Sequence, residues 1–313
     1  MKPFIRAAEV WRPTQDHTLL EFGAGLFGDA LSFAATSRAM CFGRAEGLPG
    51  DAWDEARPIL LKQFEGSHFR RTSAAKLAGL TCAVALPFFV AGELTSVLVL
   101  FGSDDQASTG AIELWRNDPR ISSDMTLVDG YYGGTPTAFE ALTRDTYLPR
   151  GTGLPGMAWQ RDEAVIMANL SEATRFLRGD VASDAGFQRG VSWPCSALGQ
   201  SSYVLTLLSG LDTPLARRVE RWSFDRAGEQ LVLSAGYCEA QGTLAPDSLH
   251  MPLTEVDEAI MQSLNKGVPA LLDKAARTVG AVGVSAQAAG SDSVVLIPVL
   301  VEDKVTELLA LYL

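Results

Sequence analysis

The sequence has few basic residues for its length, and they are scattered. Among 313 residues, 26 Lys and Arg stand against 37 Asp and Glu, which gives a formal net charge of −11. No run of basic residues is longer than two. Binding along a phosphate backbone needs clustered Lys and Arg. The composition therefore excludes an extended nucleic-acid surface, and we expect no nucleic-acid partner.

Long apolar segments are also lacking. The longest, residues 80–92, is interrupted by Thr81 and Pro87 and is shorter than the roughly 20 residues that a membrane-spanning helix needs. The first residues, Met1 to Arg6, do not form the apolar stretch of a secretory leader. We therefore expect a protein without a membrane partner that works in the cytoplasm.

Cysteine and histidine are sparse and widely spaced. There are three His and four Cys, and the cysteines form neither a Cys-x-x-Cys motif nor a Cys-His pair (Cys41, Cys82, Cys195 and Cys238). Disulfide frameworks and zinc sites both depend on such spacings. The pattern predicts reduced thiols, mostly in the core, and no metal site.

What the sequence has is apolar material and internal repetition. Hydrophobic residues make up 47% of the chain, enough for large cores. A Glu-x-Trp motif begins at Glu9, Glu113 and Glu220, and each copy is followed by an apolar run that ends in Gly. Recurrence at a nearly fixed offset is the signature of repeated units.

Two longer motifs recur at nearly the same offset. Gly-Leu-Pro-Gly-x-Ala-Trp occupies residues 47–53 and 153–159, and Phe-x-Arg occupies residues 69–71 and 176–178. The third copy lacks both motifs, but residues 298–312 align without a gap on residues 87–101. We therefore predict three repeats, at residues 1–104, 105–212 and 213–313, of which the third is degenerate.

Each repeat is predicted to be α+β. Short alternating runs indicate an initial hairpin, and Pro with Gly at residues 47–50 indicates a tight turn. An Ala-rich segment that stops at Gly79 indicates a short helix. Residues 82–90 and 94–101 read as a closing hairpin. The expected unit is an antiparallel sheet of five or six strands, with short helices and loops on one face.

On these motifs, the first two repeats resemble the GAF family, the small-molecule-sensing modules of bacterial signalling proteins. The resemblance implies a ligand pocket between the sheet and the loops that carry the two motifs. Carried over residue by residue, the implied ligand-binding positions are Trp53, Phe69, Arg71 and Cys82 in the first repeat and Trp159, Phe176, Arg178 and Trp193 in the second.

The sequence leaves other roles open for these residues. The aromatic side chains are also what a core needs, and Arg71 and Arg178 are also suited to pairing with a carboxylate. Cys82 is suited to a bilin, a redox thiol or a core position, and the cofactor stays unknown. If a pocket binds, its arginine favours an anionic or hydrogen-bond-accepting ligand. The third repeat is expected to keep the sheet without a ligand-sized polar pocket.

The sequence therefore favours a non-catalytic cytoplasmic signalling or regulatory protein that binds a small molecule in GAF-type pockets. One alternative is a structural or interaction module with vestigial pockets. Another is a thiol enzyme resembling the GAF-type methionine sulfoxide reductases. We expect no effector domain and no room for the helices that usually cover the back of a GAF sheet. The closing strands are apolar at successive positions, which indicates burial on both faces. We therefore expect the sheets to pack back to back, with at least one face buried in a homodimer or on a separate effector protein.

Overall fold

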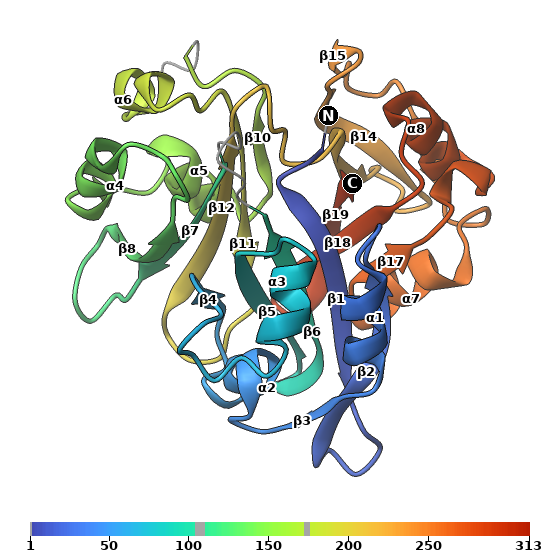
Figure 1. The fold of residues 1–313 in the computed structure, drawn as a ribbon. Helices are drawn as coiled ribbons and strands as arrows, with labels where there is room; N and C mark the ends of the chain where they lie inside the picture. Colours follow the sequence, from blue (N-terminus) through green and yellow to red (C-terminus); the bar gives the residue numbers. More distant parts are fainter. Residues whose placement is uncertain (1, 104–109, 172–175) are drawn as a thin grey trace.

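The computed structural model describes residues 2–103, 110–171 and 176–313. The described chain forms three antiparallel sheets, which follow one another along the sequence (Figure 1). The expected boundary between residues 104 and 105 lies outside the described residues. The boundary expected between residues 212 and 213 falls in the connection between the last strand of the second sheet and the first strand of the third.

The first sheet has six described strands in the order β3-β2-β1-β6-β5-β4. These strands are β3 (Cys41–Gly43), β2 (Leu19–Leu26), β1 (Ile5–Pro13), β6 (Glu93–Gly102), β5 (Cys82–Val90) and β4 (Ile59–Leu61). Three helices accompany it: α1 (Leu31–Arg38), α2 (Gly47–Asp54) and α3 (Thr72–Leu77). The helix that ends near Gly79 and the closing hairpin are both found as predicted.

The second sheet repeats this path as β9-β8-β7-β12-β11-β10. Its strands are β9 (Tyr147–Leu148), β8 (Met125–Tyr131), β7 (Gly110–Asn117), β12 (Ser202–Ser209), β11 (Arg189–Cys195) and β10 (Val165–Met167). Its helices are α4 (Thr137–Arg144), α5 (Gly153–Arg161) and α6 (Gly179–Asp184).

The third sheet follows the same path as β15-β14-β13-β19-β18-β17, with β16 also paired to β14. Its strands are β15 (Gly242–Thr243), β14 (Gln230–Cys238), β13 (Arg218–Phe224), β19 (Lys304–Tyr312), β18 (Val294–Val301), β17 (Ala270–Leu272) and β16 (His250–Pro252). Helices α7 (Glu258–Lys266) and α8 (Ala281–Ala289) and a 3₁₀ helix (Ala275–Arg277) lie beside it. The sheet expected in this part of the chain is present, but it has seven strands instead of the expected five or six, because β16 also pairs with β14.

The tight turn expected at the Leu-Pro-Gly motif is wrong, because the motif forms the first turn of helices α2 and α5. Proline is tolerated there because the first amide groups of a helix have no partner within the helix. Glycine is required because a Cβ on Gly50 would lie 2.1 Å from the carbonyl oxygen of Gly43, and one on Gly156 would lie 2.5 Å from that of Pro149. The motif thus packs a helix start directly against backbone.

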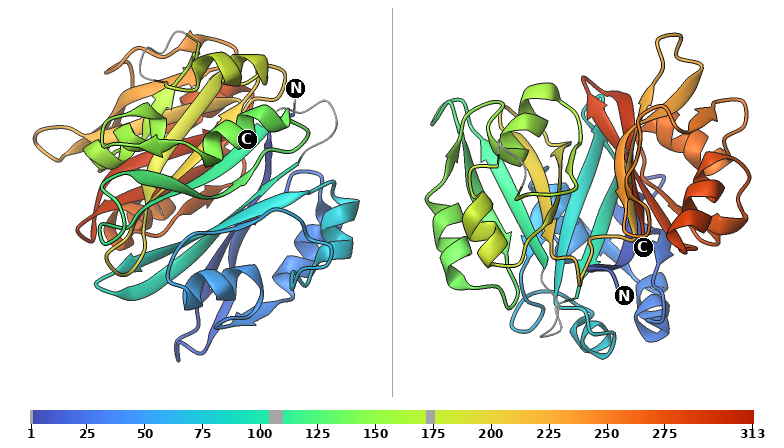
Figure 2. Two further views of the ribbon diagram at one scale, coloured as in Figure 1. Left: turned by 90° about the vertical axis from the view of Figure 1, so that its left-hand side faces the viewer. Right: turned by 90° about the horizontal axis from the view of Figure 1, so that it is seen from above.

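The backs of the three sheets face one another and form one shared core. Seen from above, the sheets lie around a common centre and their helices lie outside (Figure 2). One continuous cluster of buried apolar side chains draws on the inner strands of all three sheets. Along β5, Val84 and Leu86 point into this cluster, whereas Ala83 and Ala85 pack towards the helices. The closing strands are therefore covered on both faces, as their apolar runs predicted.

The chain itself supplies the cover that the apolar strands require. The three sheets bury each other's backs, so the homodimer or separate effector protein expected from the sequence is not needed for that purpose. Either partner stays a prediction, which light scattering of the purified protein tests.

Three equivalent leucines test the shared core. Leu98, Leu205 and Leu309 occupy matching positions, opposite Leu86, Trp193 and Ile297 in the closing hairpins, and all are fully buried in the shared cluster. Each Leu→Ala change should lower the free energy of unfolding by about 2–5 kcal/mol. Because the cluster is continuous, urea unfolding should remain one cooperative transition that shifts as a whole. Separate transitions, only one of which moves, would contradict a shared core.

Candidate functional site

Between each sheet and its helices lies a separate cluster of buried apolar side chains, which we call a chamber, and the glutamate of Glu-x-Trp lies in it beside the tryptophan. In the first chamber, Arg71 Nη1 lies 2.5 Å from Glu9 Oε1 and also donates to Ser37 Oγ. The indole of Trp11 donates to Glu9 Oε2 at 3.0 Å. The Arg71 and Glu9 side chains are 1% and 0% exposed. The arginine implied as a ligand-binding residue is therefore paired inside the chamber.

The second chamber contains the same arrangement, with two hydrogen bonds instead of one between the guanidinium and the carboxylate. Arg178 donates from Nη1 to Glu113 Oε1 at 2.6 Å and from Nη2 to Oε2 at 2.9 Å. Nη1 also donates to Thr143 Oγ1 at 2.6 Å, and the indole of Trp115 donates to Glu113 at 2.9 Å. The pair is bidentate, which is the strong geometry for a guanidinium with a carboxylate.

The third chamber keeps the buried pair but takes its arginine from another place. Arg218, two residues before Glu220 on the same strand, donates from Nε to Glu220 Oε1 at 2.6 Å. Ser285 from α8 and Tyr312 from β19 each donate to Glu220 at 2.7 Å, and the indole of Trp222 donates at 2.9 Å. The third sheet therefore has no Phe-x-Arg arginine, but the charge of its buried glutamate is balanced all the same.

Arg71 differs from Arg178 in having hydrogen-bond donors that the described residues do not use. Its Nε and Nη2 are buried without a hydrogen-bond partner among them. The guanidinium carbon lies 4.7–5.8 Å from the centres of five aromatic rings, those of Trp11, Phe33, Phe42, Phe69 and Phe101. Such contacts stabilise a buried cation but do not replace hydrogen bonds.

The structure brings only part of the implied site together. Phe69 and Phe176 lie against their arginines, at 5.2 and 5.3 Å. Trp53 packs at the edge of the first chamber beside Arg44, and Trp159 packs in the second beside Arg150. Cys82 and Trp193 point the other way, into the shared core. They therefore lie across the sheet from the arginines with which the resemblance groups them.

The sheets meet along three seams, and the strand register identifies equivalent positions in them. Gly25, Gly130 and Gly236 lie opposite the three Glu-x-Trp glutamates. The next residue along each strand, at the seam, is Leu26 in the first sheet, Tyr131 in the second and Tyr237 in the third. The seams therefore have tyrosine at two of these positions and leucine at one.

Tyrosine fills two of the seams. Between the first and second sheets, the Tyr131 hydroxyl hydrogen-bonds that of Thr81 at 2.9 Å, and its ring stacks on Phe4. Between the second and third sheets, the buried ring of Tyr237 lies 5.3 Å from the Arg189 guanidinium. Burial raises the pKa of Tyr237, so its hydroxyl is neutral.

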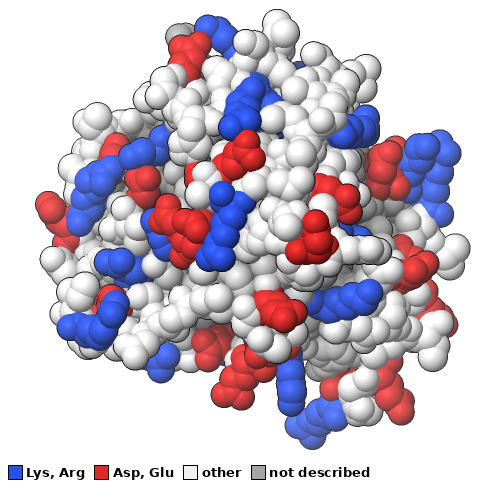
Figure 3. Space-filling view, turned by 90° about the horizontal axis from the view of Figure 1, so that it is seen from below, with Lys and Arg blue, Asp and Glu red and all other residues white. Residues whose placement is uncertain are grey.

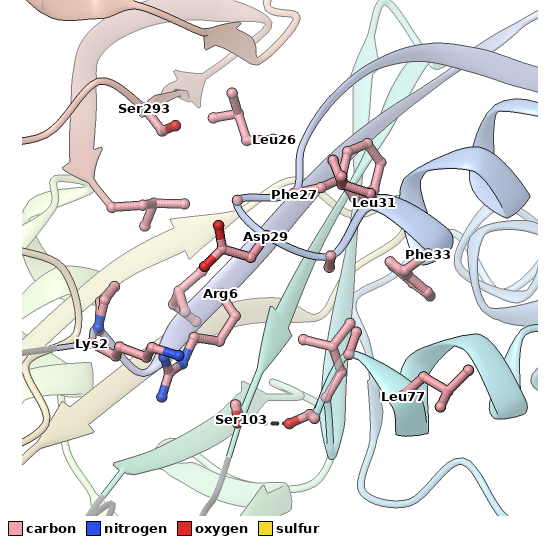
Figure 4. Close-up of a pocket in the computed structure, with 18 of the residues that line it drawn as sticks. Lys2, Arg6, Leu26, Phe27, Asp29, Leu31, Phe33, Leu77, Ser103 and Ser293 are labelled. Carbon is pink, nitrogen blue, oxygen red and sulfur yellow. Dashed lines mark hydrogen bonds between the residues drawn. The ribbon is translucent and has the colours of Figure 1, made fainter.

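The seam between the third and first sheets is open. Leu26 and Ser293 line a cleft of about 730 Å³ there. Lys2 and Arg6 lie on one side of it, and Leu31, Phe33 and Leu77 lie on the side of helices α1 and α3 (Figure 4). Leu26, 4% exposed, thus borders the cleft at the position that tyrosine occupies in the other two seams.

The cleft is basic in an acidic protein. Among the residues that the structure describes, the charged side chains that line it are Lys2, Arg6, Arg217 and Asp29, three basic and one acidic, whereas the whole chain carries a net charge of −11. Arg217 also donates from Nη1 to the carbonyl oxygen of Gly290 at 2.6 Å, which fixes its guanidinium at the cleft. On the face seen from below, acidic and basic residues are mixed (Figure 3). The arrangement suits an anion of small-molecule size.

The filled seam between the second and third sheets holds a buried carboxyl group. The side chain of Glu307 is 3% exposed, and it accepts a hydrogen bond from the amide of Ala164. Burial raises the pKa of Glu307 to about 7, while the Ala164 amide and Arg221, 3.6 Å away, act in the opposite direction. This carboxyl therefore titrates near neutral pH at a contact between two sheets.

Among the described residues we find neither a candidate metal site nor a candidate membrane-spanning helix. No group of three or more His, Cys, Asp and Glu side chains lies close enough there to hold a metal ion. No described helix has both the length and the apolar character to cross a membrane.

Reasoning from sequence missed most of the cleft. It treated Glu9, Glu113 and Glu220 only as markers of repetition and did not assign the glutamates to the chamber arginines. It also missed Arg6 and Arg217, although both stand three residues before a Glu-x-Trp glutamate, where the second copy has Gly110. Alignment of the three segments shows arginine at this position in the first and third and glycine in the second.

No family model and no curated protein matches this chain. Solved structures with a similar fold include GAF domains. A GAF domain of nlh2 from A. Aeolicus is 18% identical over 33% of this chain and 60% of its own, with a TM-score of 0.26. A free methionine-R-sulfoxide reductase from Neisseria meningitidis is 17% identical over 32% and 51%, with a TM-score of 0.24. A NreA protein from Staphylococcus aureus, mutated in its nitrate binding site, is 17% identical over 35% and 79%, with a TM-score of 0.27.

The chain thus spans about half to three fifths of the first two of these structures. Its curled antiparallel sheets, each with a few helices, form an α+β fold. These likenesses extend to about a third of the chain and identify neither a ligand nor an activity.

The buried pair of the second chamber predicts a large effect on stability. Glu113→Ala should lower the free energy of unfolding by about 3–5 kcal/mol, because it leaves the Arg178 guanidinium buried without its counter-ion. Glu140→Ala, which removes the partner of exposed Arg144, should change it by less than about 1 kcal/mol. Urea unfolding of both variants measures the difference, and equal effects would exclude a structural role for the buried pair.

Glu307 predicts a pH dependence with a definite sign. Its pKa rises from 4.5 to about 7 on folding, so the folded state binds more protons between these values and loses stability as the pH rises through them. Glu307→Gln keeps an acceptor for Ala164 and should be more stable than the parent at pH 8, by roughly 1–3 kcal/mol. The difference should vanish below pH 4.5. Exposed Glu302→Gln is the control, and a pH-independent difference for Glu307→Gln would rule out this titration.

Proposed function

We propose that this chain is a non-catalytic regulatory protein of three GAF-like units, at residues 1–104, 105–212 and 213–313, that binds a small anionic molecule. The cleft at the third seam carries this proposal. Its volume of about 730 Å³ lies within the range of small-molecule sites. The common strand order and the recurring buried glutamate support the division into three units.

The charges of the cleft favour it over the chambers as the binding site. In the second and third chambers, the arginines Arg178 and Arg218 are already bound to glutamates of their own sheets. An anion there would have to displace a buried carboxylate or approach it closely, which is unfavourable in a low-dielectric core. Among the described residues, the cleft is lined by three basic side chains and one acidic side chain, and it is open to solvent.

The first chamber is a second candidate site. Arg71 has two buried nitrogens without a hydrogen-bond partner among the described residues, and a small hydrogen-bond acceptor would satisfy them. If Arg71→Ala abolishes binding and a cleft variant retains it, the ligand binds in this chamber and not in the cleft.

The thiol-enzyme alternative is disfavoured by the sheet order. Exposed Cys41 lies on β3 and Cys82 on β5, four strand positions away in the first sheet, which corresponds to roughly 19 Å at the usual strand spacing. Burial also raises the pKa of Cys195 to about 12, which keeps that thiol protonated and unreactive. The interaction-module alternative predicts instead that no small molecule stabilises the protein.

A single substitution tests the cleft. Leu26→Tyr introduces at the open seam the residue that fills the other two, so it should fold and block the cleft. We expect some members of a panel of small carboxylates and phosphates to raise the melting temperature of the parent by several degrees, because a ligand at 100 times its Kd stabilises by about 2.7 kcal/mol. Leu26→Tyr should abolish this shift.

Leu19→Tyr, which lies on the same strand outside the cleft, is the matched control and should keep the shift. An undiminished shift in Leu26→Tyr would exclude the cleft as the site. The absence of any shift in the parent would contradict the proposed function itself.

A further inference from the structure

The helix side of the cleft exposes two large apolar side chains. Leu31, at the start of α1, is 75% exposed, and Leu77, at the end of α3, is 82% exposed. Both line the cleft together with the buried apolar residues Leu26, Phe27 and Phe33. Scattered surface leucines are ordinary, but these two lie on the same wall of one concave site.

The equivalent helices of the second sheet carry polar residues at these positions. Alignment on Phe33 and Phe139 places Thr137 opposite Leu31, and alignment on Gly79 and Gly186 places Asp184 opposite Leu77. In the second sheet, Tyr131 fills the adjoining seam. At these two positions, therefore, the first sheet has exposed leucines beside the open seam, and the second sheet has polar residues beside a filled one.

The cations lie across the cleft from the leucines. Arg6 lies on β1 and Lys2 just before it, on the opposite side from Leu31 and Leu77 (Figure 4). Arg217 adds a third positive charge from the segment that precedes β13. One wall is therefore suited to an anionic head and the other to an apolar chain.

We infer that the ligand of the cleft is an amphipathic carboxylate, an alkyl chain that ends in a carboxyl group. The carboxylate binds the Lys2, Arg6 and Arg217 side, and the alkyl chain covers Leu31 and Leu77. This inference rests on the proposed function, to which it adds the chemical class of the ligand.

Both parts of such a ligand gain by binding. The carboxylate gains charge-assisted hydrogen bonds from the basic side chains. Each methylene that leaves water against leucine should add roughly a fourfold gain in affinity. Affinity should therefore rise with chain length until the chain extends past the apolar wall, and a headgroup without charge should lose most of it.

Isothermal titration calorimetry of the full chain with sodium acetate, sodium decanoate and decanol tests this. Decanoate should bind at least tenfold more tightly than acetate and at least tenfold more tightly than decanol. Leu77→Ser should weaken decanoate by fivefold or more and leave acetate unchanged, because its side chain is already exposed and contributes little to folding.

Two further variants and two controls complete the experiment. Lys2→Gln and Arg217→Gln should weaken acetate and decanoate alike. Arg12→Gln, at the other end of the first strand, and Leu142→Ser, a 40% exposed leucine on α4, should change neither. Circular dichroism of each variant confirms that it is folded before titration.

The outcomes separate the inference from the proposed function. Equal affinities for acetate and decanoate, or no effect of Leu77→Ser, would overturn the amphipathic ligand and leave an anion site standing. Decanol binding as tightly as decanoate would overturn the role of the cations. If none of the three probes binds but other anions raise the melting temperature of the parent, the ligand class is wrong and the proposed function stands. If no anion binds at all, both fail.

Discussion

The fold depends on one constraint: the closing strands are apolar on both faces, and none of the helices that the structure describes covers the backs of the three sheets. The sheets therefore bury each other, and the inner strands of all three contribute to a single cluster. This arrangement fixes how the sheets meet, because each seam must be filled by the side chains that border it. Two seams are closed by tyrosines, Tyr131 and Tyr237, and the third has Leu26 in that position and a cleft beside it. The candidate site is thus a consequence of how three similar units enclose a common core.

All three chambers contain the Glu-x-Trp motif, although the residues around it differ. The glutamate and tryptophan of Glu-x-Trp are buried in all three, and each glutamate accepts from an arginine and an indole. The arginine comes from Phe-x-Arg in two copies and from the strand in the third, yet the buried charge is balanced in each. Because an uncompensated buried carboxylate is costly, the fold needs this balance in each sheet, although the sequences around the three glutamates differ. The buried pairs in the chambers then have a structural role, and the cleft lies between two sheets instead of between one sheet and its helices.

The sequence predicted the elements better than their assembly. The closing hairpins, the helix that stops at Gly79 and the antiparallel sheets follow from short-range patterns of alternation, turns and caps. The Leu-Pro-Gly segment was misread as a turn, because the carbonyl oxygens that exclude a Cβ at Gly50 and Gly156 belong to residues several positions away. No single segment of the sequence predicts the cleft, because the residues that line it come from both ends of the chain, from Lys2 to Leu313. Only the replacement of tyrosine by leucine at an equivalent position marks it, and that equivalence rests on strand register.

The central claim is that the open seam holds an amphipathic anion, and a crystal structure of the protein soaked with 10-bromodecanoate tests it most directly. Anomalous scattering locates the bromine, and the electron density locates the carboxylate. We expect the carboxylate within hydrogen-bonding distance of Lys2, Arg6 or Arg217 and the bromine beyond Leu31 and Leu77 at the outer end of the apolar wall. Bromine and carboxylate inside the first chamber next to Arg71, or no bound molecule in the cleft at a concentration that raises the melting temperature, would contradict the account.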